Sequence, residues 1–320
     1  MKILVTGCAG FIGAACSEKL LERGDEVIGI DNLNNYYDTS LKQARLQNLQ
    51  KNKNFVFHKI DITDLDALQK ILVQEKPQRI LHLAAQVGVR YSIENPLQYI
   101  QDNVVGFTNL LTVAQKLETL ENFVFASSSS VYGANTKMPY KTSDFVDHPI
   151  SIYAASKKSD ELIAYVYAHM YKMPLTGLRY FTVYGPWGRP DMAPIKFAEN
   201  VLAGKPIPVF NHGNHSRDFT YIDDIVQGTI LALDHPKAYQ IYNIGFGSPM
   251  QLMDFIGLLE KALGKKAIID MQPKQPGDVD NTWADISGLK KDFGYQPKVS
   301  LREGIERFAK WFVEYSYLIS

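Results

Sequence analysis

The chain has 320 residues, 46% hydrophobic and 21% charged, which is enough to bury a large core in one domain or in two closely packed ones. Thirty-four basic residues balance thirty-four acidic ones, so net charge argues for neither a nucleic-acid partner nor a membrane surface. The two cysteines, Cys8 and Cys16, have no zinc-type spacing, and neither a signal peptide nor an apolar stretch of about 18 residues is visible. We therefore expect a cytoplasmic protein without a bound metal.

The first predicted strand, Lys2–Thr6, runs directly into a turn that contains Gly7, Gly10 and Gly13, and residues 14–21 have helical composition. Strand, glycine turn and helix are the context that a dinucleotide-binding fingerprint needs. The glycines let the backbone approach a pyrophosphate, whose charge is favoured at a helix N-terminus. A glycine turn alone could be ordinary loop sequence.

A second apolar run, residues 26–30, ends at Asp31, which is eighteen residues beyond Gly13. At this position a carboxylate reaches the adenosine ribose hydroxyls and favours NAD over the phosphorylated cofactor. The combination of strand, glycines, helix, strand and acid predicts an NAD site.

Strands and helices then alternate along the first half of the chain. Strands are predicted at residues 55–58, 79–83 and 123–126, and helices at residues 41–50, 65–74 and 91–118. This alternation is typical of a Rossmann-like, doubly wound parallel α/β sheet with helices on both faces.

Several residues at the ends of these strands are candidates for contact with the cofactor. Asp61 and Ile62 could hold the adenine amine, although this segment could equally form the helix N-cap region before Asp64. Small residues after His82 let the backbone pass beneath a cofactor. Asn103, in the helix that follows, can hydrogen-bond locally, so a structural role is expected for it.

The fifth strand runs into four serines, residues 127–130. Open α/β sheets bind ligands at the carboxyl ends of their strands, where these hydroxyl groups lie. A flexible serine linker is the alternative, but such linkers seldom start from a buried strand.

Tyr153 and Lys157 are four residues apart, which places both side chains on one face of a helix. A free phenol, with a pKa of about 10, is a weak base at neutral pH, and a neighbouring ammonium group favours its ionised form. The pair is therefore interpreted as a proton acceptor and its activator. Taken alone, it could also be a surface tyrosine and a solvated lysine on an amphipathic helix.

Together, the glycine turn, Asp31, the serine tract before Val131-Tyr132-Gly133 and the Tyr153–Lys157 pair resemble the extended short-chain dehydrogenase/reductase family, specifically its nucleotide-sugar epimerases. The resemblance spans essentially the whole chain. It implies that Tyr153 is the catalytic base, that Lys157 binds the nicotinamide ribose and favours the phenolate, and that Ser128 hydrogen-bonds the reacting sugar oxygen. The cofactor-binding set that it implies is Gly7, Gly10, Phe11, Ile12, Gly13, Asp31, Asn32, Asp61, Ile62, Leu83, Ala84, Ala85, Asn103, Tyr153, Lys157 and Tyr180.

The residues that handle the oxidised sugar distinguish the reactions within this family. The related dehydratases carry an Asp-Glu pair where this chain has Ser129 and Ser130, and the sugar-acid decarboxylases carry a Glu at the position of Ser130. Serine is a poor acid or base for removing a C5 proton or assisting loss of a carboxylate. Epimerisation at C4 is the expected reaction.

The segment around Thr182 and Arg189 resembles the epimerases that act on UDP-glucuronate, in which the neutral-hexose enzymes' usual Asn is replaced by Thr. An arginine can bind a carboxylate through two charge-assisted hydrogen bonds. We therefore assign Arg189 and Thr182 to the C5 carboxylate, together with some of the serines Ser128, Ser129 and Ser130. The alternative for Arg189 is a surface or phosphate-facing role.

The resemblance also implies a binding site for the UDP group. Val209 and Phe210 border the uracil, Arg217 binds the diphosphate or instead pairs with a nearby carboxylate, and Asp278 holds the uridine ribose. Two positions differ from the hexose epimerases: a diphosphate-binding Arg is Gln275 here, and a Lys near the nicotinamide is Val87. Arg90 could compensate for the first change.

The expected organisation is a NAD-binding domain of residues 1–180, rejoined by 217–245, and an interleaved UDP-sugar-binding domain of residues 181–216 and 246–320. The expected activity is the interconversion of UDP-glucuronate and UDP-galacturonate. The alternatives are a 4-epimerase of neutral or N-acetylated UDP-hexoses, a UDP-glucuronate decarboxylase and a catalytically silent NAD sensor. Family members pair through helices near residues 91–118 and 153–171, so a homodimer is also expected.

Overall fold

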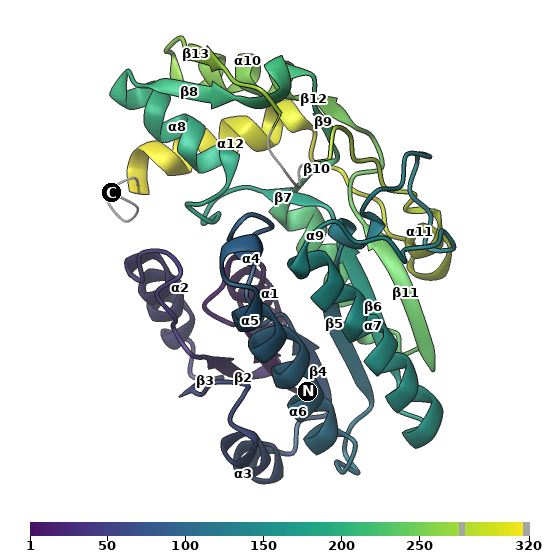
Figure 1. The fold of residues 1–320 in the computed structure, drawn as a ribbon. Helices are drawn as coiled ribbons and strands as arrows, with labels where there is room; N and C mark the ends of the chain where they lie inside the picture. Colours follow the sequence, from purple (N-terminus) through teal and green to yellow (C-terminus); the bar gives the residue numbers. More distant parts are fainter. Residues whose placement is uncertain (275–278, 316–320) are drawn as a thin grey trace.

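Seven parallel strands form the central sheet, in the order β11-β6-β5-β4-β1-β2-β3 (Figure 1). The structure is a computed structural model that describes residues 1–274 and 279–315. The chain progresses in opposite directions from β1 and β4, which creates a crevice at the carboxyl ends of these two strands. The strands are β1 (Lys2–Thr6), β2 (Glu26–Asp31), β3 (Phe55–Lys59), β4 (Arg79–His82), β5 (Asn122–Ser128), β6 (Leu175–Tyr180) and β11 (Tyr239–Ile244).

Helices cover both faces of the sheet, which confirms the predicted doubly wound fold (Figure 1). Each face buries its own cluster of apolar side chains between helices and strands. The helices on one face are α1 (Phe11–Glu22), α2 (Ser40–Gln50) and α9 (Ile222–Asp234); those on the other are α3 (Leu65–Glu75), α6 (Gly106–Ala114) and α7 (Ile152–Tyr171).

The single long helix predicted over residues 91–118 is wrong. Asn95 precedes Pro96 and has φ −128° and ψ 56°, which interrupts the helix because proline disfavours helical backbone in the residue before it. The segment instead forms four pieces, one of them a π-helix, a form often found at functional sites. They are α4 (Tyr91–Glu94), α5 (Pro96–Tyr99), the π-helix η1 (Ile100–Val105) and α6.

A smaller layer of helices and short strands lies over the carboxyl ends of the sheet (Figure 1). It contains Val209, which was assigned to the uracil and lies at the end of an extended segment. Its elements are β7 (Thr182–Tyr184), α8 (Ala193–Ala203), β8 (Pro206–Val209), η3 (Phe210–Gly213), β9 (Ser216–Arg217), β10 (Phe219–Tyr221), β12 (Met250–Gln251), α10 (Leu252–Leu263), β13 (Ile268–Met271) and α12 (Leu301–Tyr315). Two further short helices pack on the sheet domain: η2 (Ser129–Tyr132) against α7, and α11 (Ser287–Phe293) against β11 and α9.

Strand β11, within the segment expected to rejoin the NAD-binding domain, lies in the central sheet, where it pairs with β6. The chain therefore leaves the sheet after β6, builds part of the smaller layer and returns. The domain limits themselves stay a prediction. Within residues 1–274 and 279–315, no helix combines the length and apolar character needed to cross a bilayer, and no cluster of three potential metal ligands occurs.

Candidate active site

The predicted glycine turn follows β1 and is packed too tightly for larger residues. Gly7 has φ +71°, and a Cβ there would lie 2.8 Å from the backbone nitrogen of Ala84. A Cβ on Gly13 would lie 2.0 Å from the Gly7 carbonyl oxygen. Helix α1 begins just after Gly10, with no side-chain cap and no acidic residue in its first turn. This N-terminus suits the pyrophosphate of NAD.

Asp31 lies at the end of β2 and stabilises the neighbouring loops. Its carboxylate accepts hydrogen bonds from the backbone nitrogens of Ala9 (3.1 Å) and Leu33 (2.8 Å). Its position beside the glycine turn fits the ribose-binding role, because both border one cavity of about 500 Å³.

Asp61 connects two loops at the same end of the sheet. It accepts from the side-chain amide of Asn32 (2.8 Å) and from the backbone nitrogen of Thr63 (2.9 Å). The helix cap is Asp64, whose carboxylate accepts from the backbone nitrogen of Ala67 at 3.0 Å. Asp61 is therefore not the cap itself, and its side of the cavity also contains Ile62.

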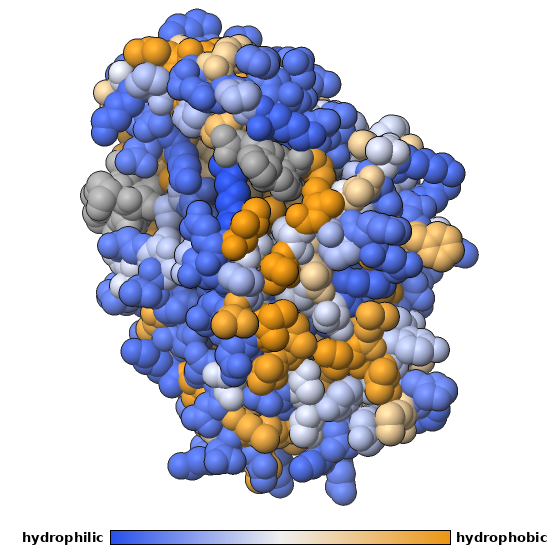
Figure 2. All heavy atoms as spheres, in the orientation of Figure 1, coloured by the Kyte–Doolittle hydropathy of each residue, from blue (hydrophilic) through white to orange (hydrophobic). Residues whose placement is uncertain are grey.

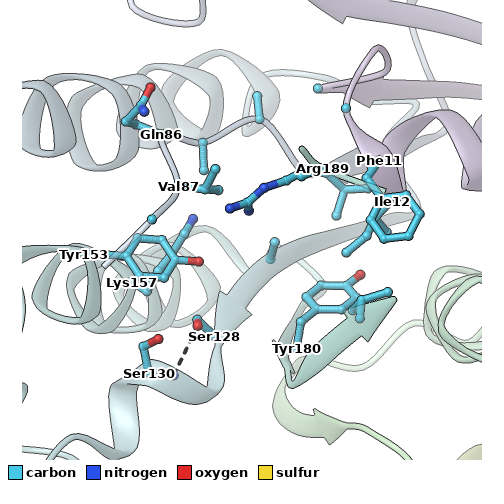
Figure 3. Close-up of a pocket in the computed structure, with 18 of the residues that line it drawn as sticks. Phe11, Ile12, Gln86, Val87, Ser128, Ser130, Tyr153, Lys157, Tyr180 and Arg189 are labelled. Carbon is cyan, nitrogen blue, oxygen red and sulfur yellow. Dashed lines mark hydrogen bonds between the residues drawn. The ribbon is translucent and has the colours of Figure 1, made fainter. Parts of the chain in front are cut away.

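Tyr153 and Lys157 both face the cavity from the first turns of α7 (Figure 3). The helix begins at the Ser151 cap, whose hydroxyl accepts from the backbone nitrogen of Ala154 at 3.1 Å. The ring of Tyr153 packs edge-to-face on Tyr99, with 6.1 Å between the ring centroids. Lys157 is buried, and both side chains border the cavity, so their roles as proton acceptor and activating cation stay a prediction.

Asn103 differs from the expected direct cofactor contact and is not among the residues that line the cavity. Its amide oxygen accepts from the backbone nitrogen of Gln86 (2.7 Å), and its amide nitrogen donates to the Gln86 carbonyl (3.0 Å) and to the Ser156 hydroxyl (2.9 Å). Ser156 in turn donates to the Tyr153 carbonyl at 2.8 Å. Asn103 thus fastens the cavity wall to the helix that carries Tyr153, which is the structural role expected for a buried amide in the π-helix.

All four serines at the end of β5 border the cavity, and Ser127 already has an anionic partner. The hydroxyl of Ser127 donates to Glu161 at 2.6 Å. Ser128 accepts from the backbone nitrogen of Ser130 at 3.1 Å, which starts η2, and Ser128, Ser129 and Ser130 all line the cavity (Figure 3). These hydroxyls can donate to a sugar.

Arg189 reaches into the cavity from the loop after β7 and already has an anionic partner (Figure 3). Its guanidinium donates to both carboxylate oxygens of Asp191, at 3.0 and 2.5 Å. Burial opposes the charge, but Asp191 keeps the pKa of Arg189 above its ordinary value. A substrate carboxylate would have to share Arg189 with Asp191 or displace it.

The other expected site residues lie in two places. Phe11, Ile12, Leu83, Ala84, Ala85, Val87, Tyr180, Thr182 and Arg217 line the same cavity. Arg217 donates to the backbone carbonyls of Ser216, Val279 and Asp280. Arg90, Val209 and Phe210 lie outside its lining; Arg90 stacks on Phe210 at 4.8 Å, and Val209 is buried. Asp278 and Gln275 lie outside the described residues.

Sequence reasoning missed Arg45, which joins the two loops that carry the expected cofactor and substrate residues. Its guanidinium donates to the carbonyls of Ala9 (3.0 Å), Trp187 (2.5 Å) and Gly188 (3.0 Å) and to the Tyr37 hydroxyl (3.0 Å). The available signal was its spacing, because Arg45 lies midway between two leucines on the buried face of α2.

The chain matches the family described as GDP-mannose 4,6 dehydratase over residues 4–308. It is 46% identical to UDP-glucuronate 4-epimerase 2 of Arabidopsis thaliana, over 98% of this chain and 76% of that protein. It is 43% identical to a probable UDP-glucuronate 4-epimerase of Rhizobium meliloti, over 98% and 97%. Among solved structures, the UDP-glucuronic acid 4-epimerase of Bacillus cereus in complex with UDP-glucuronic acid and NAD matches with a TM-score of 0.92 and 37% identity, over 98% and 99%.

Proposed function

The chain belongs to the GDP-mannose 4,6 dehydratase family, and within it we propose that the protein is a NAD-dependent UDP-glucuronate 4-epimerase. The observation that carries the proposal is a single cavity bordered by the glycine turn, Asp31, Ser128 and the Tyr153–Lys157 pair. The resemblance to extended short-chain dehydrogenase/reductase epimerases is thereby confirmed.

The proposed mechanism uses Tyr153 as a base for the sugar C4 hydroxyl. Lys157, one turn along α7, favours the phenolate, and Ser128 hydrogen-bonds the same sugar oxygen. NAD, which the glycine turn, Asp31 and Lys157 would hold, would supply a reversible hydride acceptor for C4, so its oxidation state would be unchanged over a turnover. Tyr153 then returns the proton to O4, which gives the epimer.

Serines rather than acids beside the sugar support epimerisation over dehydration or decarboxylation. Of the described residues that line the cavity, the carboxylates are Asp31, Asp61 and Asp102. Asp31 and Asp61 stabilise the nucleotide-side loops, and Asp102 accepts from the Gln98 amide at 2.7 Å. These carboxylates therefore do not supply the acid or base that the related dehydratases and decarboxylases carry at the positions of Ser129 and Ser130.

The substrate's C5 carboxylate is assigned to Thr182, Arg189 and the serines. The oxidised intermediate is a β-keto acid, which loses carbon dioxide when the breaking bond aligns with the carbonyl π system. Polar anchoring that holds the bond out of this alignment would preserve the carboxylate. The UDP group is assigned to Val209, Phe210 and Arg217, with Asp278 at the uridine ribose and Arg90 as an additional cation.

We also propose that the protein acts as a cytoplasmic homodimer. Large apolar side chains are exposed on neighbouring α5 and α7, where Figure 2 shows hydrophobic residues gathered. Leu97 is 82% exposed, Leu162 57% and Met170 62%, a surface that pairing of two copies would bury. Both cysteines are free and buried, which suits a reducing compartment.

The decisive experiment incubates the purified protein with UDP-glucuronate, without added NAD, and identifies the product by NMR. Formation of UDP-galacturonate is expected. UDP-pentose with carbon dioxide would instead indicate a decarboxylase, and turnover of UDP-glucose or its N-acetylated analogue alone would indicate a hexose epimerase. Light scattering of the same sample tests the dimer.

A further inference from the structure

Three charged side chains of α7 are buried side by side: Lys157, Asp160 and Glu161, with exposures of 2%, 1% and 2%. Glu161 has its own cation, because Arg179 donates to its two oxygens at 2.7 and 2.8 Å. Burial opposes its charge, but Arg179 lowers the pKa of Glu161. Glu161 therefore does not need the active-site lysine.

Asp160 is in a different position. Its Oδ2 accepts a hydrogen bond from Lys157 Nζ at 3.1 Å, while its Oδ1 is buried and has no partner within the described part of the chain. A buried carboxylate with an unmatched oxygen is a costly place for a negative charge. Burial raises the pKa of Asp160 to about 7, although Lys157 acts to lower it.

The other ionisable groups nearby do not replace Lys157 as the partner of Asp160. Glu161 adds negative charge next to it. His82, on the neighbouring strand β4, stays neutral because burial, and then Lys157, lower its pKa to about 3. Lys158 is 23% exposed and pairs with Glu161 at 3.6 Å.

We propose that Asp160 is a positioning residue for Lys157, and that its proton sets how much of the Lys157 charge acts on the Tyr153 hydroxyl. With Asp160 neutral, the full ammonium charge favours loss of the Tyr153 proton. With Asp160 ionised, the pair is neutral overall and this assistance is weaker. The inference rests on the proposed function, because it assumes that Tyr153 is the catalytic base.

The first test measures the proton on Asp160 without any catalysis. An acid whose folded pKa is raised binds more protons in the folded state, so its contribution to stability is present at low pH and lost as pH rises. From pH 4 to 7, urea unfolding should therefore show wild type losing stability relative to Asp160→Asn, which cannot ionise. Parallel curves would overturn the proposal.

The second test compares the pH dependence of kcat/KM for UDP-glucuronate. Above about pH 7, where Asp160 is ionised in wild type, Asp160→Asn removes a negative charge that opposes phenolate formation. The part of the acidic limb that lies there should move down by about half a pH unit, which is about threefold in rate, and the two enzymes should agree at lower pH, where Asp160 is protonated. Lys158→Gln is the matched control. It changes the charge of the adjacent residue, which faces Glu161, and should leave the limb in place.

The outcomes separate the two proposals. A limb that does not move in Asp160→Asn, or a folded variant that retains NAD and loses activity at every pH, would overturn the role of Asp160. Wild-type protein that produces no UDP-galacturonate would instead overturn the proposed function, while the unfolding curves would still report the Asp160 proton.

Discussion

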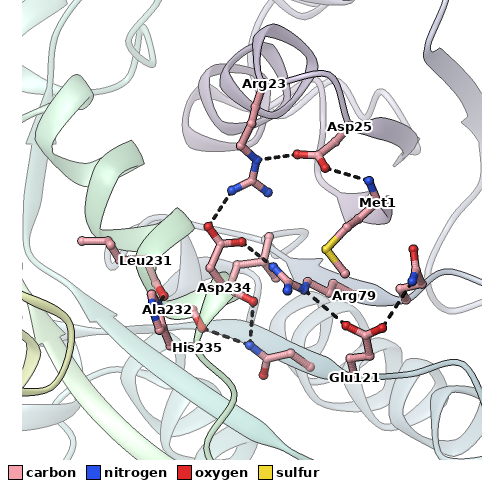
Figure 4. Close-up of polar contacts among 12 residues, drawn as sticks. Met1, Arg23, Asp25, Arg79, Glu121, Leu231, Ala232, Asp234 and His235 are labelled. Atoms are coloured by element: carbon pink, nitrogen blue, oxygen red, sulfur yellow. Dashed lines mark hydrogen bonds and ion pairs between the residues drawn. The ribbon is translucent and has the colours of Figure 1, made fainter.

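The two ends of strand β4 handle charge in opposite ways. At the amino end, Arg79 pairs with Asp234 and lies 3.9 Å from Glu121, while Arg23 pairs with Asp25 and Asp234 (Figure 4). At the carboxyl end, His82 has a buried ring nitrogen, Nε2, without a partner among the described residues. The amino ends of the strands are therefore held by ion pairs, whereas His82 at the carboxyl end is buried next to Leu83, which lines the cavity.

The residues that stabilise the fold and those that border the cavity therefore lie at opposite ends of the strands. Ion pairs at the amino ends of the strands connect β4 with the ends of α1 and α9, and Asn122 of β5 donates a hydrogen bond to the Ala232 carbonyl at 3.0 Å. None of these residues lines the cavity. The carboxyl edge gathers the loops that follow each strand, as parallel sheets require. Changes at the amino edge should therefore alter stability alone, and changes at the carboxyl edge should alter activity first.

The largest effect is expected for Tyr153→Phe. It removes the proposed proton acceptor and should lower kcat by about a thousandfold, ~4 kcal/mol in activation free energy. The melting temperature and the bound NAD should be unchanged, because the ring still packs on Tyr99. Product formation followed by NMR measures the loss. Normal turnover in this variant would remove the basis of the mechanism.

Lowering the pH should reduce the free energy of unfolding, because His82 is buried as a neutral ring. Burial, and then Lys157, lower its folded pKa to about 3, below the ordinary value of 6.5. A base with a depressed folded pKa stabilises the fold above its unfolded pKa, and this contribution is lost as pH falls from 6.5 towards 3. The loss should reach about 3 kcal/mol by pH 4.

Urea unfolding of His82→Gln measures this contribution. Glutamine can keep a hydrogen bond to Thr6, whose hydroxyl lies 2.8 Å from His82 Nδ1, but it cannot ionise. The variant should lose less stability than wild type between pH 6.5 and 4. Equal losses in the two proteins would contradict the neutral state of the ring. The effect has the opposite pH direction to that of Asp160, so the two contributions can be separated.

Breaking the amino edge should reduce stability without changing the chemistry. Arg79→Met leaves Asp234 with one cation fewer and should cost about 2 kcal/mol in the free energy of unfolding, with kcat and KM at 25 °C unchanged. Lys19→Ala, which breaks an exposed pair with Glu22, should cost less than about 0.5 kcal/mol. A kinetic change in Arg79→Met would contradict the separation of the two edges.

The parts of the site that could be predicted from sequence are those encoded within one segment. Gly7, Gly13 and Asp31 belong to one strand-turn-helix-strand unit, and Tyr153 and Lys157 share two turns of one helix. These residues have fixed relative positions once the local structure forms.

Contacts between distant segments could not be derived in the same way. Arg45 binds the Trp187 carbonyl across 142 residues, and its role depends on how two loops meet above the sheet. The interruption at Pro96 could have been read from the sequence, because proline disfavours helical backbone in the residue before it. The Lys157–Asp160 pair is local, yet its importance depends on burial by other elements.

Arg189 allows the most specific comparison of the two ends of the strands. Its ion pair with Asp191 lies at the carboxyl ends, and the ion pair of Arg79 with Asp234 lies at the amino ends. Arg189 and Asp191 are each 22% exposed, and Arg189 faces the cavity, so a substrate carboxylate can compete for its guanidinium. Removing this anchor in Arg189→Ala should let the oxidised sugar sample the alignment that releases carbon dioxide. The fraction of turnovers that give carbon dioxide and UDP-pentose should rise by about threefold or more.

Asp191→Asn separates the anchor from its competitor. It leaves the Arg189 guanidinium in place and removes the internal carboxylate, so KM for UDP-glucuronate should fall while the product partition stays that of wild type. If Arg189→Ala leaves the partition unchanged, Thr182 and the serines suffice to hold the carboxylate. The Arg189–Asp191 pair would then be a structural ion pair like the one at the opposite edge of the sheet.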